Sequence, residues 1–560
     1  MEPNENTPLL QIDENNDNKV NESINSKLNN EDAESSDSNS CTEGTKRRSR
    51  LPFHYPPAHK NARVRREAGS KGIATYHRYR YYNKLAGTHL LTLWSIPDHV
   101  VPETFFFPFA PIIKPSGKQN SVITIFSIWN TMMGSSLLSI PWAIQQAGFA
   151  GGMIIMFAMG SICFYTAYRI VSLRCVADFP KTAVEFPDLC RHLLGKWAEW
   201  VATFFSLIPL LGGAVVYWVL MSNFLYFIGV YAYESLKPGG KDAIMLNSNY
   251  SDVYCPGSIP INGSSDMQLV LNGGNSTNEI FYEYWDMDST IPFYIAACFA
   301  PLVSLKSPTF FTKLNALGTL SVIYLMIFIV IKGVKWGVHF NTVDKTLPDF
   351  VHLFQTTFPV LVGTLSLSFF IHNCVLSIMR NQKKPENNAR DLAIAYVLVG
   401  ATYLVIGVIF FITFPFEKSC IEDNLLNNFR SNDLLAVITR VFLLFQILTL
   451  YPLIVYILRV QIMHFAFGSI YPSWKHVFAL NMVVLTICIL FNVYLPRVGT
   501  IIRYCGAISG LAYIFTLPCV TYMKALKEKG QLTMTVLFLH ICIIILGICN
   551  FISQFFVHAV

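Results

Sequence analysis

The sequence predicts an all-α polytopic membrane protein of about eleven transmembrane helices, preceded by a disordered tail. Of its 560 residues, 52% are apolar and only 14% are charged, whereas a soluble chain carries about 25% charged residues. A single soluble core stops growing beyond about 300 residues, so a soluble protein of this length would need several polar surfaces. The charges for those surfaces are missing, and long uncharged runs follow Lys118 instead.

Residues 1–118 are expected to form a cytosolic tail. Residues 1–45 are rich in Asn, Asp, Glu and Ser, too polar to offset the cost of ordering, and they contain no signal-peptide core. The chain then turns basic, and the segment 76–110 is aromatic and apolar. That composition favours docking onto a partner surface, although a simple juxtamembrane anchor would have the same composition.

The extreme N-terminus contains a candidate sorting signal. Glu5, Leu9 and Leu10 fit an acidic dileucine pattern, in which an extended peptide offers one carboxylate and two leucines to an adaptor protein. A match this short also arises by chance. Because the tail is expected to be accessible, we interpret it as an endolysosomal sorting signal.

The charge-poor runs predict the spans, each about 20 or more mostly apolar residues long. Their expected limits are 120–147, 149–174, 197–231, 290–305, 314–337, 354–379, 391–414, 433–463, 473–494, 499–522 and 533–556. Lys and Arg collect in alternate loops, which places the N-terminus in the cytosol and the C-terminus in the lumen.

The loop at about 232–289 is expected to face the lumen. It contains three N-x-S/T sequons, at Asn249, Asn262 and Asn275, which predict glycosylation. An oxidising compartment permits disulfides, and Cys255 and Cys420 are the cysteines of the predicted lumenal loops. We expect them to be bridged, the alternative being two free thiols.

The first span carries a polar cluster in its middle that weakens regular helix. In transporters, non-helical backbone at membrane depth lines a cavity, and its free amides and carbonyls become ligands for a carboxylate and an ammonium. The same pattern also fits close helix packing through small residues. The candidate substrate-binding residues are Asn130, Thr131, Met132, Met133, Gly134, Ser135 and Ser136.

An inverted repeat of five plus five helices would pair the first span with the sixth. There, His372 and Asn373 fit either a pathway lining or a satisfied interfacial role. Thr449 lies deep in the eighth span, where a hydrogen bond to its own helix is the simpler interpretation.

Other classes of function are not expected. The chain contains neither HExxH nor GxxxxGK[ST], so an enzyme is not predicted. Its 13 cysteines form no CxxC pairs, which argues against zinc, and its basic residues form no continuous stripe of the kind that binds nucleic acid. The spans contain no acidic residue with an obvious cationic partner, so the charge of a substrate is not predicted.

Five segments resemble the sodium-coupled neutral amino acid transporters of the amino acid/auxin permease group. They are WNTMMGSSLLSIPWAIQQAGF, FFIHNC, NQKKPENNARDLAIAY, VYWVLMSNFL and LLFQILTLYPL, and the resemblance covers residues 75–560, most closely to a lysosomal, arginine-sensing branch. It implies a five-plus-five inverted repeat with a broken first helix and an eleventh helix. It further implies arginine-stimulated export of essential amino acids such as leucine across lysosomal and late endosomal membranes, with signalling to the growth-control complex mTORC1.

The resemblance also implies roles for individual residues. Asn130 and Thr449 would form a sodium-like site, and sodium, as coupling or structural ion, is the only cofactor implied. Ser135 stands where the family pattern has Thr. The tail would bind Ragulator and Rag GTPases, and without them could insert into the cavity. The implied docking residues are Tyr79, Tyr82, Leu85, Pro97 and Pro102. The alternative is a sodium- or proton-coupled neutral amino acid carrier without a signalling role.

Overall fold

The computed structural model describes residues 120–176, 185–236, 252–256, 276–304, 318–380, 382–467 and 471–557. The predicted sorting signal, the partner-docking segment and all three sequons lie outside these residues. The chain divides into residues 1–79 and 80–560, and the described residues all belong to the second unit.

Every predicted span is helical in the described part of the chain, where β-structure is limited to isolated bridge residues. The first span is built from α5 (Ser121–Met132), η1 (Ser135–Leu138) and α6 (Ile140–Ala147), and the sixth from α15 (Pro359–Ser368) and α16 (Val375–Arg380). The other spans are α7 (Phe149–Val176), α9 (Lys196–Leu236), α12 (Ile291–Val303), α14 (Gly318–Trp336), α17 (Asn388–Thr413), α18 (Leu434–Phe467), α19 (Trp474–Tyr494), α20 (Val498–Gly510) continued through the π-helical turn η5 (Leu511–Thr516) into α21 (Leu517–Glu528), and α22 (Met534–Phe556).

Eight of these described helices are long and apolar enough to cross a membrane alone. The first, fourth and sixth spans use shorter apolar helices. In the fourth span, α12, the last turn is capped from outside, because Arg459 and Asn481 each donate a hydrogen bond of 3.0 Å to the carbonyl oxygen of Val303. Carbonyls at a helix end need such partners, so these two side chains allow α12 to end early inside the protein.

The first helix is broken, as predicted. Met133 and Gly134 have extended backbone, with φ/ψ of −76°/94° and −129°/−164°, and the helix resumes with Pro141 in the first turn of α6. Proline has no N–H to donate and is tolerated in that first turn. The sixth span is interrupted in the same way between Ser368 and Val375.

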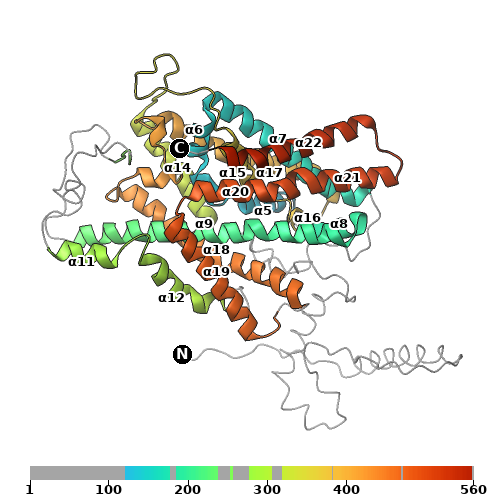
Figure 1. Ribbon diagram of the computed structural model, residues 1–560. Helices are drawn as coiled ribbons and strands as arrows, with labels where there is room; N and C mark the ends of the chain where they lie inside the picture. The colour runs from blue at the N-terminus through green and yellow to red at the C-terminus, as the bar shows by residue number, and fades with distance from the viewer. Residues whose placement is uncertain are drawn as a thin grey trace, which may run out of the picture. The chain divides into compact units, whose positions relative to one another are not determined.

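The two broken spans lie in the packed centre of the bundle (Figure 1). α15 contacts α6, η1 and α20, whereas α17 contacts α5, α6 and α7. The long helix α9 runs alongside and packs on α18 and α20. Both breaks are therefore surrounded by intact helices.

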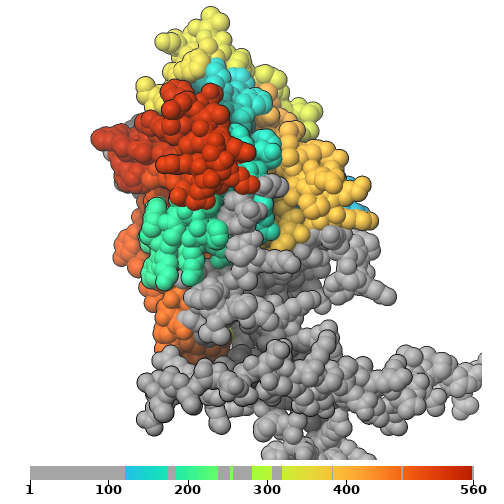
Figure 2. Space-filling view, turned by 90° about the vertical axis from the view of Figure 1, so that its right-hand side faces the viewer, coloured from blue at the N-terminus to red at the C-terminus, as the bar shows by residue number. Residues whose placement is uncertain are grey.

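A short helix, α8 (Phe186–Leu194), precedes α9 and does not span the membrane. Glu185 and Asp188 form a capping box at its start, and Gly195 links it to α9 with φ of 94°, which glycine adopts without strain. Figure 2 shows this end of the bundle, with α8 and the start of α9 in green beside the turn of α21 and α22 in red.

At the opposite end, three contacts hold residues 252–256, two against the loop between α17 and α18 and one against α14. A disulfide joins Cys255 to Cys420, the pair expected from the sequence. Val253 forms a β-bridge with Phe429, and Lys332 of α14 pairs with Asp252 at 2.6 Å. This end is called the disulfide side below.

Candidate functional site

The two breaks are joined by one side chain, Tyr403 of α17. Its hydroxyl lies 3.0 Å from the carbonyl oxygen of Met132, at the end of α5, and 2.7 Å from that of Ser368, at the end of α15. Carbonyls at helix ends have no partner within their helix, and the single proton of this hydroxyl is within reach of one such carbonyl at each break. Tyr403 is fully buried.

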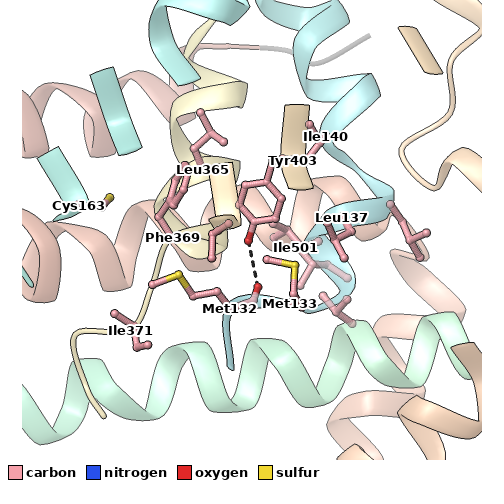
Figure 3. Close-up of a cluster of buried hydrophobic side chains, with 14 of the residues drawn as sticks. Met132, Met133, Leu137, Ile140, Cys163, Leu365, Phe369, Ile371, Tyr403 and Ile501 are labelled. Atoms are coloured by element: carbon pink, nitrogen blue, oxygen red, sulfur yellow. Dashed lines mark hydrogen bonds between the residues drawn. The ribbon is translucent and has the colours of Figure 1, made fainter. Parts of the chain in front are cut away.

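Apolar side chains surround this contact (Figure 3). Met132, Met133 and Leu137 of the first span lie beside Leu365 and Phe369 of the sixth. The ring of Phe369 packs edge-on against Tyr403, with centroids 5.2 Å apart. The breaks are therefore held in a dry environment, in which each hydrogen bond has a larger electrostatic effect than in water.

The predicted substrate-binding residues divide into two groups. Met132, Met133 and Ser136 are buried, whereas Asn130, Thr131, Gly134 and Ser135 are partly exposed. The accessible group thus supplies an amide, two hydroxyls and a glycine backbone.

The polar side chains before the break already have partners. Asn130 accepts a hydrogen bond of 3.1 Å from Thr319 of α14, and the Thr131 hydroxyl donates to the carbonyl of Ser127 at 2.7 Å. Both retain the capacity to accept a further hydrogen bond. Existing hydrogen bonds hold both side chains in place, and each can still bind a ligand atom.

The backbone after the break offers donors. The first amides of a helical turn have no acceptor within that turn, and the hydrogen bonds of the described backbone give none to the amides of Ser135 and Ser136. A Cβ placed on Gly134 would lie 3.7 Å from the hydroxyl oxygen of Tyr217 of α9. The backbone of residues 134–136 can therefore receive a carboxylate, and Tyr217 of α9 lies next to this backbone at Gly134.

Among the hydrogen bonds of the described residues, none joins the two members of the predicted sodium-like pair. Thr449 is buried and donates to Gln446 of its own helix at 2.8 Å, as the simpler interpretation expected, while Asn130 pairs with α14. The lone pairs of the Thr449 hydroxyl stay available to a cation.

His372 is fully buried, and its Nε2 lies 2.9 Å from the Thr166 hydroxyl of α7. The residue is in the unwound segment of the sixth span, so this contact ties that segment to α7.

Sequence reasoning missed Tyr403 and its neighbour Thr402, whose hydroxyl accepts a 3.0 Å hydrogen bond from the Trp129 indole. A Thr-Tyr pair inside the apolar run of the seventh span was the available signal. It also missed buried ion pairs at the ends of spans, including Glu199 with Arg191 at 3.3 Å. The expectation that the spans contain no acidic residue with an obvious cationic partner was wrong for Glu199. This residue lies in the first turn of α9, and α8 brings Arg191 to it.

Comparisons with known proteins agree with this architecture. The family described as transmembrane amino acid transporter protein matches residues 117–236 and 261–559. The sodium-coupled neutral amino acid transporter 9 homolog of Caenorhabditis elegans is 45% identical over 85% of this chain and 80% of its own. Neutral amino acid transporter 9 of Xenopus tropicalis is 42% identical over 91% of this chain and 95% of its own.

A solved structure, MhsT in complex with L-phenylalanine, aligns with 77% of this chain and 97% of its own at 11% identity, with a TM-score of 0.45. That value is too low to carry an argument. The family match covers most of the chain and the relatives exceed 40% identity over most of their own lengths. This multi-pass membrane protein therefore belongs to the transmembrane amino acid transporter family, together with the sodium-coupled neutral amino acid transporters.

Proposed function

We propose that this chain exports essential amino acids such as leucine from lysosomes and late endosomes, that arginine stimulates this export, and that the substrate binds at the break in the first span. The observation that carries the transport proposal is the contact of Tyr403 with Met132 and Ser368. It couples two interrupted helices through one hydroxyl, so a change at one break is transmitted to the other.

The substrate site is assigned to the accessible residues of the break. The carboxylate would accept hydrogen bonds from the free amides of Ser135 and Ser136, at the positive end of the following helical turn. The ammonium would face Asn130 and Thr131, whose side chains are positioned by α14 and by the first span itself. Both backbone ends of any amino acid are recognised in this way, and its side chain decides selectivity.

Sodium is proposed as a coupling or structural ion at Asn130 and Thr449. Hydroxyl, amide and backbone carbonyl oxygens are suitable ligands for a hard monovalent cation. Buried Thr449 offers such an oxygen without carrying a charge of its own.

Signalling to mTORC1 is proposed for the tail. Residues 76–110, with Tyr82 and Pro97 among the docking positions, would bind Ragulator and Rag GTPases from the cytosolic side, which requires a cytosolic N-terminus and a lumenal C-terminus. The support is the aromatic composition of this segment together with the resemblance. The names of the relatives refer only to neutral amino acid transport, which favours, as second candidate, a sodium- or proton-coupled carrier without a signalling role.

The first experiment is uptake of labelled leucine and binding of labelled arginine by the full chain in liposomes, each with and without residues 1–118. We expect leucine uptake that arginine accelerates. Thr131→Ala with Ser135→Ala removes both accessible hydroxyls of the break and should weaken arginine binding, while Ser161→Ala, which removes an exposed hydroxyl on α7, is the matched control.

Two outcomes would overturn the assignments separately. Unchanged binding in the Thr131 and Ser135 double variant would remove the substrate site. Ragulator capture retained after Tyr82→Ala together with Pro97→Ala would remove the docking role of the tail while leaving transport untouched.

A further inference from the structure

A cavity of about 480 Å³ lies on the disulfide side, away from the break. Its lining includes Gln145 of α6, Lys345 and Gln355 of the loop between α14 and α15, and Glu417 and Lys418 after α17. A volume of this size is within the range of small-molecule sites, about 300 to 1,000 Å³. The proposed substrate site at residues 130–136 does not contribute to it.

Lys418 brings a buried cation to this cavity. Only 5% of the residue is exposed, and its Nζ donates to the carbonyl oxygen of Phe414 at 2.7 Å and lies 5.6 Å from the ring centre of Phe411. None of the described ion pairs includes Lys418. An ammonium has three donors, and burial without a counter-ion is unfavourable, so an anion in the cavity would be stabilised here.

The two glutamines of the lining also present donors. The side-chain oxygen of Gln145 accepts a hydrogen bond from Gln146 at 2.7 Å, and that of Gln355 lies 3.3 Å from the Thr357 hydroxyl, which shares its proton with the carbonyl oxygen of Gln146. Because their oxygens are engaged by the protein, their NH₂ groups remain to donate to a ligand. An excess of donors around a buried ammonium matches the oxygen atoms of an anion.

The charges of the lining narrow the ligand class. Lys345 and Lys418 are opposed by the single carboxylate of Glu417, and the apolar rings of Phe350 and Phe411 complete the wall. This favours a small organic molecule with a carboxylate over a multiply charged phosphate. We propose that this cavity binds the carboxylate group of a small organic acid, supplied either by a free amino acid or by an organic acid without an amino group.

The cavity is placed to act on the first span. Its wall continues into residues 352–357, which hold the turn between α6 and α7 through backbone hydrogen bonds. The amide of Phe149 donates to the carbonyl of His352 at 2.8 Å, and the amide of Gln355 donates to that of Ala147 at 3.0 Å. Gly148 fits this turn because its φ is 77° and any Cβ would lie 2.7 Å from the backbone of Leu353. A ligand that bridges Lys418 and Gln145 therefore braces α6, the second half of the broken helix, against the end of α17.

The test uses the full chain in nanodiscs, with hydrogen exchange of residues 345–355 and 411–419 as the readout. The probes are L-leucine and succinate, each also tested in the Thr131→Ala and Ser135→Ala background, which separates this cavity from the proposed substrate site. We expect probe-dependent protection of both segments. Lys418→Met should raise the concentration for half-maximal protection about tenfold or more, because a charge-assisted hydrogen bond is lost.

A second variant guards against misfolding of Lys418→Met. Gln145→Leu with Gln355→Leu leaves the buried lysine in place and should also weaken protection, whereas Lys529→Met, an exposed lysine in the turn between α21 and α22, should not. Protection by leucine alone supports an amino acid as the ligand, and protection by succinate alone supports a non-amino acid. The proposal is overturned if neither probe protects the two segments. It is also overturned if both cavity variants are protected as strongly as the unmodified chain.

The pH dependence gives an independent readout. Burial lowers the pKa of Lys418 to about 7, against the opposing effect of nearby Asp349. The ammonium is charged below that pH and neutral above it. Other ionisable groups in the lining are Lys345, Glu417 and His352. We expect stronger protection by succinate at pH 6 than at pH 8 in the unmodified chain, and a smaller difference in Lys418→Met.

Discussion

The hydroxyl of Tyr403 lies 3.0 Å from the carbonyl oxygen of Met132, although 271 residues separate them in the chain. The same hydroxyl lies 2.7 Å from the carbonyl oxygen of Ser368. One side chain on an intact helix thus lies within hydrogen-bonding distance of a carbonyl oxygen at each of the two helix breaks. This arrangement fixes the positions of the two interrupted segments relative to each other, while both segments stay non-helical.

Tyr403→Phe removes this hydroxyl and keeps the ring. We expect a loss of leucine uptake and a loss of stability of about 1 to 3 kcal/mol, because the two buried carbonyls lose the one donor that they share. Uptake in liposomes and thermal unfolding in micelles measure the two effects. Tyr451→Phe is the matched control, since the hydroxyl of that buried tyrosine donates to the sulfur of Cys488 at 3.8 Å. Equal losses in both variants would contradict a special role for Tyr403.

Thr449→Val tests the proposed sodium site. The methyl group replaces an oxygen that a cation could use, so uptake should require a higher sodium concentration. The control is Thr439→Val on the same helix, a buried threonine whose hydroxyl donates to Leu435 at 2.8 Å. Leucine uptake measured against sodium concentration, with choline as replacement, distinguishes them. An identical sodium dependence in all three proteins would argue against an ion at Thr449.

Lys332→Met tests the buried ion pairs of the disulfide side. Lys332 lies 2.6 Å from Asp252 and 2.8 Å from Asp433, with 4% of its side chain exposed. Removing it takes the buried cation away from both carboxylates and leaves Asp252 with the exposed Lys335, and we expect a loss of about 3 to 5 kcal/mol in unfolding free energy.

The chain supplies a matched control for this change. Lys335 also pairs with Asp252, at 3.1 Å, but 57% of its side chain is exposed. Water screens such a pair, so Lys335→Met should cost less than about 1 kcal/mol. Thermal unfolding of both variants side by side measures the difference, and similar losses would indicate that burial does not decide the effect.

Glu185 predicts a pH dependence of stability. Burial raises its pKa to about 8, assisted by Asp188 and opposed by the hydrogen bond from Ser377 and by Arg174. A carboxyl whose folded pKa is raised holds its proton in the folded state. Its contribution to stability is therefore present in full below the ordinary value of 4.5 and is lost as the pH rises to about 8.

Glu185→Gln is neutral at every pH and should remove this dependence. We expect the unmodified chain to melt at a lower temperature at pH 8.5 than at pH 5, and the variant to show a smaller difference. Glu528→Gln, half-exposed beside Lys524, is the control. A variant that keeps the full pH dependence would place its origin at another group.

Much of the fold was predictable because span formation depends on local composition. The runs without charge locate helices such as α9 and α18 to within several residues. The cluster from Asn130 to Ser136, followed by Pro141, predicted the break in the first helix, since small and polar residues and proline weaken regular helix in the same way wherever they occur. The cysteines of the disulfide side were also expected to pair.

The candidate site could be predicted only in part. The residues of the break were named, but which of them are accessible follows from the packing of α9, α14 and α15 around them. His372 was expected either to line a pathway or to have a satisfied role near the membrane interface. Its burial and its contact with Thr166 of α7 could be seen only in the structure. The roles of sodium, of the sorting signal and of the docking tail stay predictions.

The sequence by itself determined that this chain spans a membrane many times, that its first helix is interrupted, and to which family it bears resemblance. Only the tertiary structure decided that Tyr403 joins both breaks, that Lys332 meets Asp252 across 80 residues, and that Lys418 is buried at the wall of a cavity. The physical reason is the separation along the chain over which each effect acts. Hydrophobic runs and helix breakers act on neighbouring residues, whereas the partner of a buried polar group is chosen by how distant helices pack.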